Sequence, residues 1–147
     1  MSSWRQQARI EAPIETVWEL IGDPNRYPEW AANVVEVTGL PSVEKGASYE
    51  QVGRPPWGSP ITTTFVVEEL EDLHEIQLRC TKTGYYSHWL LTPADDATFA
   101  DVEIGMDATK LGDKAFDRTL GKRWYRSLVT QALDKIKEVT ARERPRH

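Results

Sequence analysis

The 147-residue sequence contains one cysteine, three histidines and no long hydrophobic run. A single cysteine, Cys80, excludes an internal disulfide and a zinc site built from cysteines. We interpret Cys80 as a small core residue, because it lies in a strand-like segment. No segment reaches the roughly 18 apolar residues that a membrane-spanning helix needs. The first residues also lack the apolar run of a signal peptide. These absences predict a cytoplasmic protein without integral membrane contact.

Common catalytic signatures are also missing. The sequence has no glycine-rich phosphate loop, no zinc-binding histidine pair and no serine in a nucleophile-elbow motif. His74, His88 and His147 are too scattered along the chain to indicate a metal site. We therefore expect neither a metal nor a cofactor.

The charge balance argues against a nucleic-acid partner. The formal net charge is −5, and binding to phosphates requires clustered lysine and arginine. The chain is 39% hydrophobic and 28% charged, which is typical of a folded globular protein. Its length suits a single domain over residues 1–147, with a C-terminal tail from about residue 143 that is expected to fray.

Hydrophobic periodicity predicts strands and helices in a definite order. A first strand over 4–11 precedes a helix from Pro13 to Gly22 and a short second helix that begins at Pro24. Strand patterns follow near 35–37 and 49–52, and then over 61–71, 74–81, 85–92 and 98–109. The chain ends in a long helix over about 113–142. Its apolar residues fall four apart: Phe116, Leu120, Trp124, Leu128, Ala132 and Ile136.

These elements predict an α+β fold. Short connections favour antiparallel pairing of the strands, and the apolar face of such a sheet must be covered. Only the long terminal helix is large enough to cover it. Two curved surfaces that meet in this way often leave a cavity, and a ligand would bind there.

The segment from Ile10 to Pro24 resembles the opening of the START/Bet v 1-like superfamily, also called SRPBCC. The next motif, Tyr27-Pro28-Glu29-Trp30, is similar to one in the polyketide cyclase/dehydrase and lipid-transport branch. The resemblance covers essentially the whole chain. It implies a helix-grip fold, in which a curved sheet of about seven strands wraps around the C-terminal helix and two short helices follow the first strand. It also implies that Trp30 plugs one end of the sheet.

His88 and Tyr86 are the candidate catalytic residues. They share one face of the strand over 85–92, and the opposite face carries Tyr85, Ser87 and Trp89. If His88 points inward, its near-neutral pKa would suit proton transfer to a bound carbonyl compound. The commoner outcome for such a histidine is an outward or merely hydrogen-bonded position.

Aromatic residues give the stronger signal, because the chain has six tryptophans and five tyrosines. Such side chains supply large apolar walls with a polar group attached. The proline-rich loop over 53–60 is a plausible lid. The predicted ligand-binding residues are Tyr49, Arg54, Trp57, Tyr86, His88, Trp89, Trp124 and Leu128.

Three functions are consistent with these patterns. The first is binding of a small hydrophobic or aromatic molecule, such as a lipid, a quinone or a polyketide-like compound, by a monomer or homodimer. The second is a cofactor-independent polyketide aromatase/cyclase that uses Tyr, His or Arg side chains for acid-base catalysis. The third is a protein-interaction module whose interior is filled. The direction in which His88, Tyr86, Arg79 and Glu103 point would separate the first two.

Overall fold

The structure is a computed structural model that describes residues 2–143. The expected fraying of the tail falls on residues 144–147, outside the described residues. The strands are β1 (Ser2–Ile10), β2 (Val34–Thr38), β3 (Ser48–Gly53), β4 (Ile61–Glu71), β5 (Glu75–Cys80), β6 (Tyr85–Ala94) and β7 (Ala97–Met106). The helical segments are α1 (Ile14–Ile21), η1 (Pro24–Glu29), α2 (Leu111–Phe116), η2 (Asp117–Gly121) and α3 (Lys122–Glu143).

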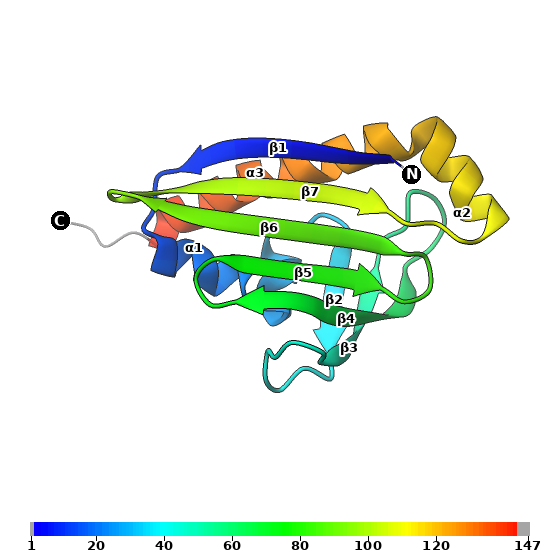
Figure 1. Cartoon of the computed structure of the whole chain (residues 1–147), viewed down its shortest axis with the longest axis horizontal. Helices are drawn as coiled ribbons and strands as arrows, with labels where there is room; N and C mark the ends of the chain where they lie inside the picture. The colour runs from blue at the N-terminus through cyan, green and yellow to red at the C-terminus, as the bar shows by residue number, and fades with distance from the viewer. Residues whose placement is uncertain (1, 144–147) are drawn as a thin grey trace.

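The strands form one antiparallel sheet in the order β1-β7-β6-β5-β4-β3-β2 (Figure 1). Every neighbouring pair except β1 and β7 is consecutive in the sequence, as short connections predict. The two N-terminal helical segments follow β1 and lead the chain to β2 at the opposite edge of the sheet, and the last strand, β7, returns to pair with β1. The sheet and the long C-terminal helix confirm the predicted α+β, helix-grip fold.

The long helix differs from its prediction in one respect. A π-helical turn, η2, separates α2 from α3, although the segment stays helical from Leu111 to Glu143. Asp117 in this turn is buried, and its carboxylate accepts hydrogen bonds from the Tyr125 hydroxyl and from the Ser2 backbone N–H. The start of β1 is thereby attached to the turn.

The core lies between the inner face of the sheet and α3, which packs against β1 and β7. Alternation along the strands turns one set of side chains inward, such as Val102 and Ile104 on β7. The facing side of α3 buries Tyr125, Leu128, Val129, Ala132, Leu133, Ile136 and Val139. Cys80 is also buried, as expected of a small core residue.

The N-terminal helices close one end of this core. Trp30 is 5% exposed and packs edge-on against Trp89 of β6, with ring centroids 5.4 Å apart. Its indole N–H donates to the carbonyl oxygen of Leu20, and the Tyr27 hydroxyl donates to that of Ile21. Trp30 therefore plugs this end of the sheet, as the resemblance implied.

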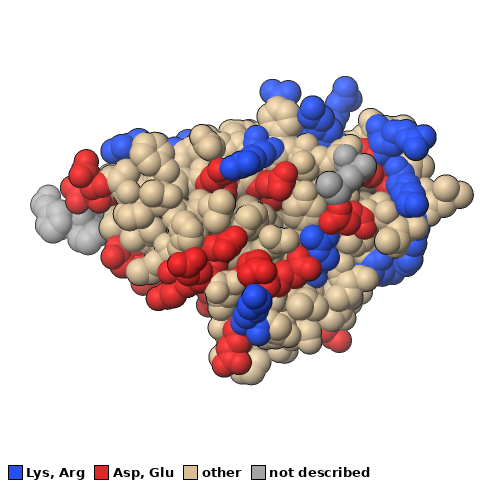
Figure 2. All heavy atoms as spheres, in the orientation of Figure 1, with Lys and Arg blue, Asp and Glu red and all other residues tan. Residues whose placement is uncertain are grey.

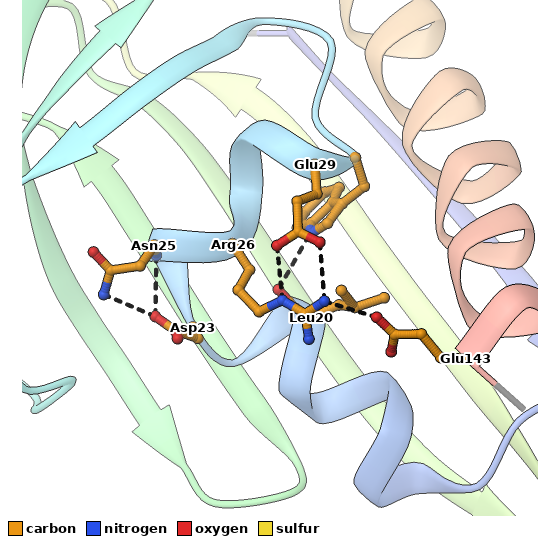
Figure 3. Close-up of polar contacts among 7 residues, drawn as sticks. Leu20, Asp23, Asn25, Arg26, Glu29 and Glu143 are labelled. Atoms are coloured by element: carbon orange, nitrogen blue, oxygen red, sulfur yellow. Dashed lines mark hydrogen bonds and ion pairs between the residues drawn. The ribbon is translucent and has the colours of Figure 1, made fainter. Parts of the chain in front are cut away.

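An ion-pair cluster joins η1 to the end of α3 (Figure 3). The guanidinium of Arg26 binds both carboxylate oxygens of Glu29, at 2.8 and 2.9 Å, and reaches Glu143 at 2.8 Å. The hydrogen bond from Arg26 lowers the pKa of Glu29 below its usual value. The cluster thus holds the far end of the long helix against the N-terminal segments.

Charged side chains on the outer face of the sheet form ion pairs with one another. Arg79 binds Glu68 at 2.8 Å and Asp107 at 2.7 Å, and Arg5 binds Asp101 at 2.6 Å. The Asp101 carboxylate of β7 therefore faces away from the core.

Candidate ligand-binding site

The space between the middle of the sheet and α3 is almost completely filled. Only about 20 Å³ is left there, enough for one water molecule but not for a ligand. Trp89 from β6 and Leu128 from α3 occupy this region, and their side chains are 1% and 5% exposed. The cavity expected between sheet and helix is therefore not in the middle of the fold.

A larger pocket of about 460 Å³ opens at one end of the sheet. Its walls come from the loop over 54–60, from inner residues of β3–β6, and from α2 and the start of α3. The N-terminal helices close the opposite end, so the pocket occupies the end they leave uncovered. Arg54, Trp57 and Trp124, three of the predicted ligand-binding residues, line it.

A continuous row of aromatic rings runs from the pocket mouth into the core. Its members, in order, are Trp57, Phe116, Trp124, Tyr85, Phe65 and Tyr49. Neighbouring ring centroids are 5.1 to 6.2 Å apart, which is the normal range for aromatic contacts. Trp57 at the mouth is 64% exposed, whereas Tyr49 at the inner end is 2% exposed. A flat apolar ligand could replace solvent along the first five of these rings, which line the pocket.

The π turn helps to place two of these rings together. An α-helix turns about 100° per residue, so residues eight apart lie about 80° apart around its axis. A π turn accommodates an extra residue and brings such a pair closer to the same side. Phe116 and Trp124 are eight apart, with ring centroids separated by 5.7 Å. The same spacing joins Asp117 to Tyr125 by a hydrogen bond of 2.8 Å.

Buried polar groups lie where the pocket meets the small inner void. Asn33, Gln51, Phe65 and Tyr85 line both spaces and so form the wall between them. Gln51 is 4% exposed, and no hydrogen bond among residues 2–143 involves its side-chain amide. The Asn33 amide donates to the Tyr85 hydroxyl at 3.2 Å. The Tyr85 proton is left available, because its hydroxyl donates to no residue within 2–143.

Burial raises the pKa of Tyr85 above its ordinary value, despite the hydrogen bond from Asn33. The phenol therefore stays protonated across the physiological range. It can donate a hydrogen bond to a ligand carbonyl or hydroxyl, but it is a poor general base.

Two predicted ligand-binding residues lie instead on the opposite face of β6. The His88 imidazole Nε2 is 2.6 Å from a carboxylate oxygen of Glu75, and the Tyr86 ring lies beneath the Arg79 guanidinium at 4.9 Å. Side chains alternate along a strand, so the inward positions of Tyr85 and Trp89 require His88 and Tyr86 to face outward. Their predicted catalytic role depended on an inward orientation, and neither side chain has it.

The remaining predicted residues are inside the protein but outside the pocket. Tyr49 stacks on Phe65 at 5.8 Å and does not line the open space. Trp89 and Leu128 fill the middle of the core. Sequence reasoning missed Gln51, Tyr85 and Phe116 as pocket residues. Gln51 and Tyr49 do share the inward parity of β3, which is the one signal that could have identified the buried amide.

Within residues 2–143 no group of three or more His, Cys, Asp or Glu side chains is arranged to hold a metal ion. None of the helices in the same range combines the length and the hydrophobicity that crossing a bilayer requires.

The chain matches a known protein family and is similar in fold to several solved structures. The model of the family described as polyketide cyclase / dehydrase and lipid transport matches residues 1–141. No curated protein shows a significant match to the sequence. A crystal structure from Thermus thermophilus is similar with a TM-score of 0.75 at 16% identity, covering 98% of this chain and 100% of that one. A START superfamily protein from Mycobacterium smegmatis gives 0.71 at 12% identity, covering 97% and 99%. At such identities these structures establish the fold alone.

Proposed function

Because the chain belongs to the polyketide cyclase/dehydrase and lipid-transport family, we propose that it binds a small hydrophobic or aromatic molecule in the pocket beneath the loop over 54–60. The observation that carries this proposal is the combination of an aromatic wall with the Gln51 amide, which lines the pocket and has no hydrogen-bond partner among the described residues. Apolar walls with a few polar groups are the usual composition of small-molecule sites.

The exposed apolar surface supports a ligand pocket over a protein-interaction module. Trp57 and Ile61 are 64% and 40% exposed, and both line the same concave space. A ligand in the pocket would cover part of this surface. The filled middle of the core would otherwise have favoured the interaction module, but the room for a ligand lies at the end of the sheet.

A cyclase-type reaction is the second candidate, and Tyr85 is the group that favours it. Its protonated hydroxyl is oriented by Asn33 and could polarise a ligand carbonyl. The sequence-based candidates His88 and Tyr86 lie on the other face of the sheet and have no access to this pocket.

Native mass spectrometry with a panel of lipids, quinones and aromatic polyketides tests the proposal. We expect a one-to-one adduct with the wild-type protein. Trp124→Ala should weaken it about 10- to 100-fold, because burial of an aromatic side chain contributes roughly 1.5–3 kcal/mol. Trp4→Ala is the matched control, since Trp4 lies outside the pocket against Lys122 and Arg126.

The same spectra distinguish binding from reaction and report whether the protein is a monomer or a homodimer. A cyclisation with dehydration would lower the ligand mass by one water, whereas simple binding leaves it unchanged. Absence of any adduct from protein that is folded by circular dichroism would refute the proposal. So would an unchanged adduct with folded Trp124→Ala.

A further inference from the structure

Three cationic side chains surround the pocket mouth without an ionic partner among the described residues. Arg54, Lys82 and Lys110 line the pocket, and none forms an ion pair with any residue in the range 2–143. By contrast, Arg5 and Arg79, on the outer face of the sheet, each bind a carboxylate within 2.8 Å. In a protein with a net charge of −5, a gathering of such cations at one concave site is a feature to be explained.

The three cations reach the mouth from three separate connections. Arg54 directly follows β3, Lys82 lies in the turn between β5 and β6, and Lys110 immediately precedes α2. Among the described residues, the one carboxylate in the pocket lining is that of Asp113, so three positive charges and one negative charge leave the lining at +2. Figure 2 shows that lysine and arginine gather at the end of the molecule where α2 lies, while acidic side chains predominate over the sheet.

The interior of the pocket offers a different chemistry. Behind the mouth are the rings of Phe116, Trp124 and Tyr85, followed by the Gln51 amide and the Tyr85 hydroxyl. These groups are neutral, because burial keeps the tyrosine protonated. Isolated charges are costly in such surroundings, so a charged group on the ligand would remain at the rim. A matching ligand is apolar along its body and anionic at its outer end.

We propose that the pocket binds an aromatic carboxylate, with the ring system against Trp124 and Phe116 and the acid group among Arg54, Lys82 and Lys110. This inference rests on the proposed binding function and specifies the ligand class. A neutral oxygen on the ring system would meet the Gln51 amide or the Tyr85 hydroxyl. The exposed rim cations contribute selectivity for the anion, while the buried rings contribute most of the affinity.

A matched pair of probes tests the acid group: 2-anthracenecarboxylate and its neutral isostere, 2-anthracenecarboxamide. Binding is followed by fluorescence titration. The carboxylate should bind the wild-type protein on the order of tenfold more tightly than the amide. The double variant Lys82→Gln/Lys110→Gln should bind both probes about equally. Lys137→Gln removes one positive charge from an exposed position on α3 outside the pocket, and it should keep the wild-type preference.

Each outcome supports or overturns a stated claim. Equal binding of the two probes to the wild-type protein, or an unchanged preference in the folded double variant, overturns the carboxylate assignment and leaves the binding function standing. Failure of both probes to bind folded wild-type protein overturns the assignment too. If the panel of lipids, quinones and polyketides also gives no adduct, the binding function fails with it.

Discussion

Tyr49 is the one described residue with a fully buried side-chain polar atom that lacks a hydrogen-bond partner within residues 2–143. Its ring is well packed on Phe65, and burial raises the pKa of its hydroxyl above the ordinary value. Tyr27 is equally buried, but its hydroxyl donates to the carbonyl oxygen of Ile21 at 2.8 Å. The two tyrosines therefore provide a direct comparison between an unsatisfied and a satisfied phenol.

We expect Tyr49→Phe to increase the free energy of unfolding by about 1 kcal/mol, because it removes a buried polar atom that has no partner within residues 2–143. Tyr27→Phe should decrease it by about the same amount, because it leaves the Ile21 carbonyl without its donor. Urea denaturation of both variants beside the wild type measures the difference. A loss of stability in Tyr49→Phe that matches the loss in Tyr27→Phe would contradict this interpretation.

At the scale of single residues, alternation could be predicted from the sequence but its direction could not. The grouping of Tyr86 with His88, opposite Tyr85 and Trp89, was correct, but the choice of the inward face depends on register with β5 and β7. Gly22 is a similar case. The helix predicted to run to Gly22 does end there, with Gly22 as its C-cap, but the φ of this glycine is an ordinary −80° that any residue could adopt. The indole of Trp18 lies where a side chain at Gly22 would be, which only the fold reveals.

At the scale of an element, the geometry of the long C-terminal helix could be predicted from the sequence only in part. Apolar residues four apart predict an uninterrupted helix that buries Phe116, Leu120 and Trp124 on one stripe. In the structure the π turn takes up an extra residue, and Leu120 is 53% exposed. The buried positions in the turn are those of Asp117 and Gly121 instead. Apolar residues of this sequence keep a spacing of four across the π turn, from Phe116 to Leu128, so periodicity could not identify the turn.

A pair of leucine substitutions tests this helix geometry. Leu128 on α3 is 5% exposed, and Leu128→Ala should lower the free energy of unfolding by about 2–4 kcal/mol. Leu120→Ala should change it by less than about 0.5 kcal/mol, because the side chain contributes little to the core. Thermal or urea unfolding compares the two variants. Similar losses would show that the helix continues through residues 117–121 as an ordinary α-helix with Leu120 buried.

At the scale of the whole molecule, ion pairs connect segments that lie far apart in the sequence. Arg26 joins η1 to Glu143 at the end of α3, and Arg5 joins β1 to Asp101 of β7. Hydrogen bonds from these arginines lower the pKa values of Glu29 and Asp101. Both carboxylates therefore favour the folded state at pH values above their ordinary pKa. This contribution is lost as the pH falls through the lower pKa values of the folded protein.

We expect the urea concentration at the unfolding midpoint to decrease as the pH is lowered from 7 to about 3. Arg26→Gln should be slightly less stable than wild type at pH 7, by well under about 1 kcal/mol because the pair is partly exposed. The difference in stability between the two proteins should shrink at acidic pH, where the Glu29 carboxylate becomes protonated and loses its ion pair with Arg26. Lys137→Gln serves as the control. Its difference in stability from the wild type should be the same at neutral and acidic pH. A difference between Arg26→Gln and wild type that widens on acidification would rule out a stabilising role for this cluster.

The overall architecture could be predicted from the sequence, whereas the position of the pocket could not. Strand periodicity, the long amphipathic helix and the motif around Tyr27 and Trp30 all led to the correct fold. The pocket depends on volumes: Trp89 and Leu128 are large enough to fill the middle of the core, so the open space is displaced to the end near Trp57. Packing of this kind follows from three-dimensional contacts that no linear pattern contains.

The separation of charge across the molecule also affects how fast an anion arrives. At an ionic strength of about 0.01 M, electrostatic fields extend roughly 30 Å, so an approaching anion experiences the net charge of −5 and is repelled. Near 0.15 M the range shrinks to about 8 Å, and the anion responds mainly to the nearest side chains. At the mouth these are Arg54, Lys82 and Lys110. Moderate salt thus screens the acidic residues of the sheet, while the cations at the mouth still attract the anion. The association rate therefore rises with salt before it falls.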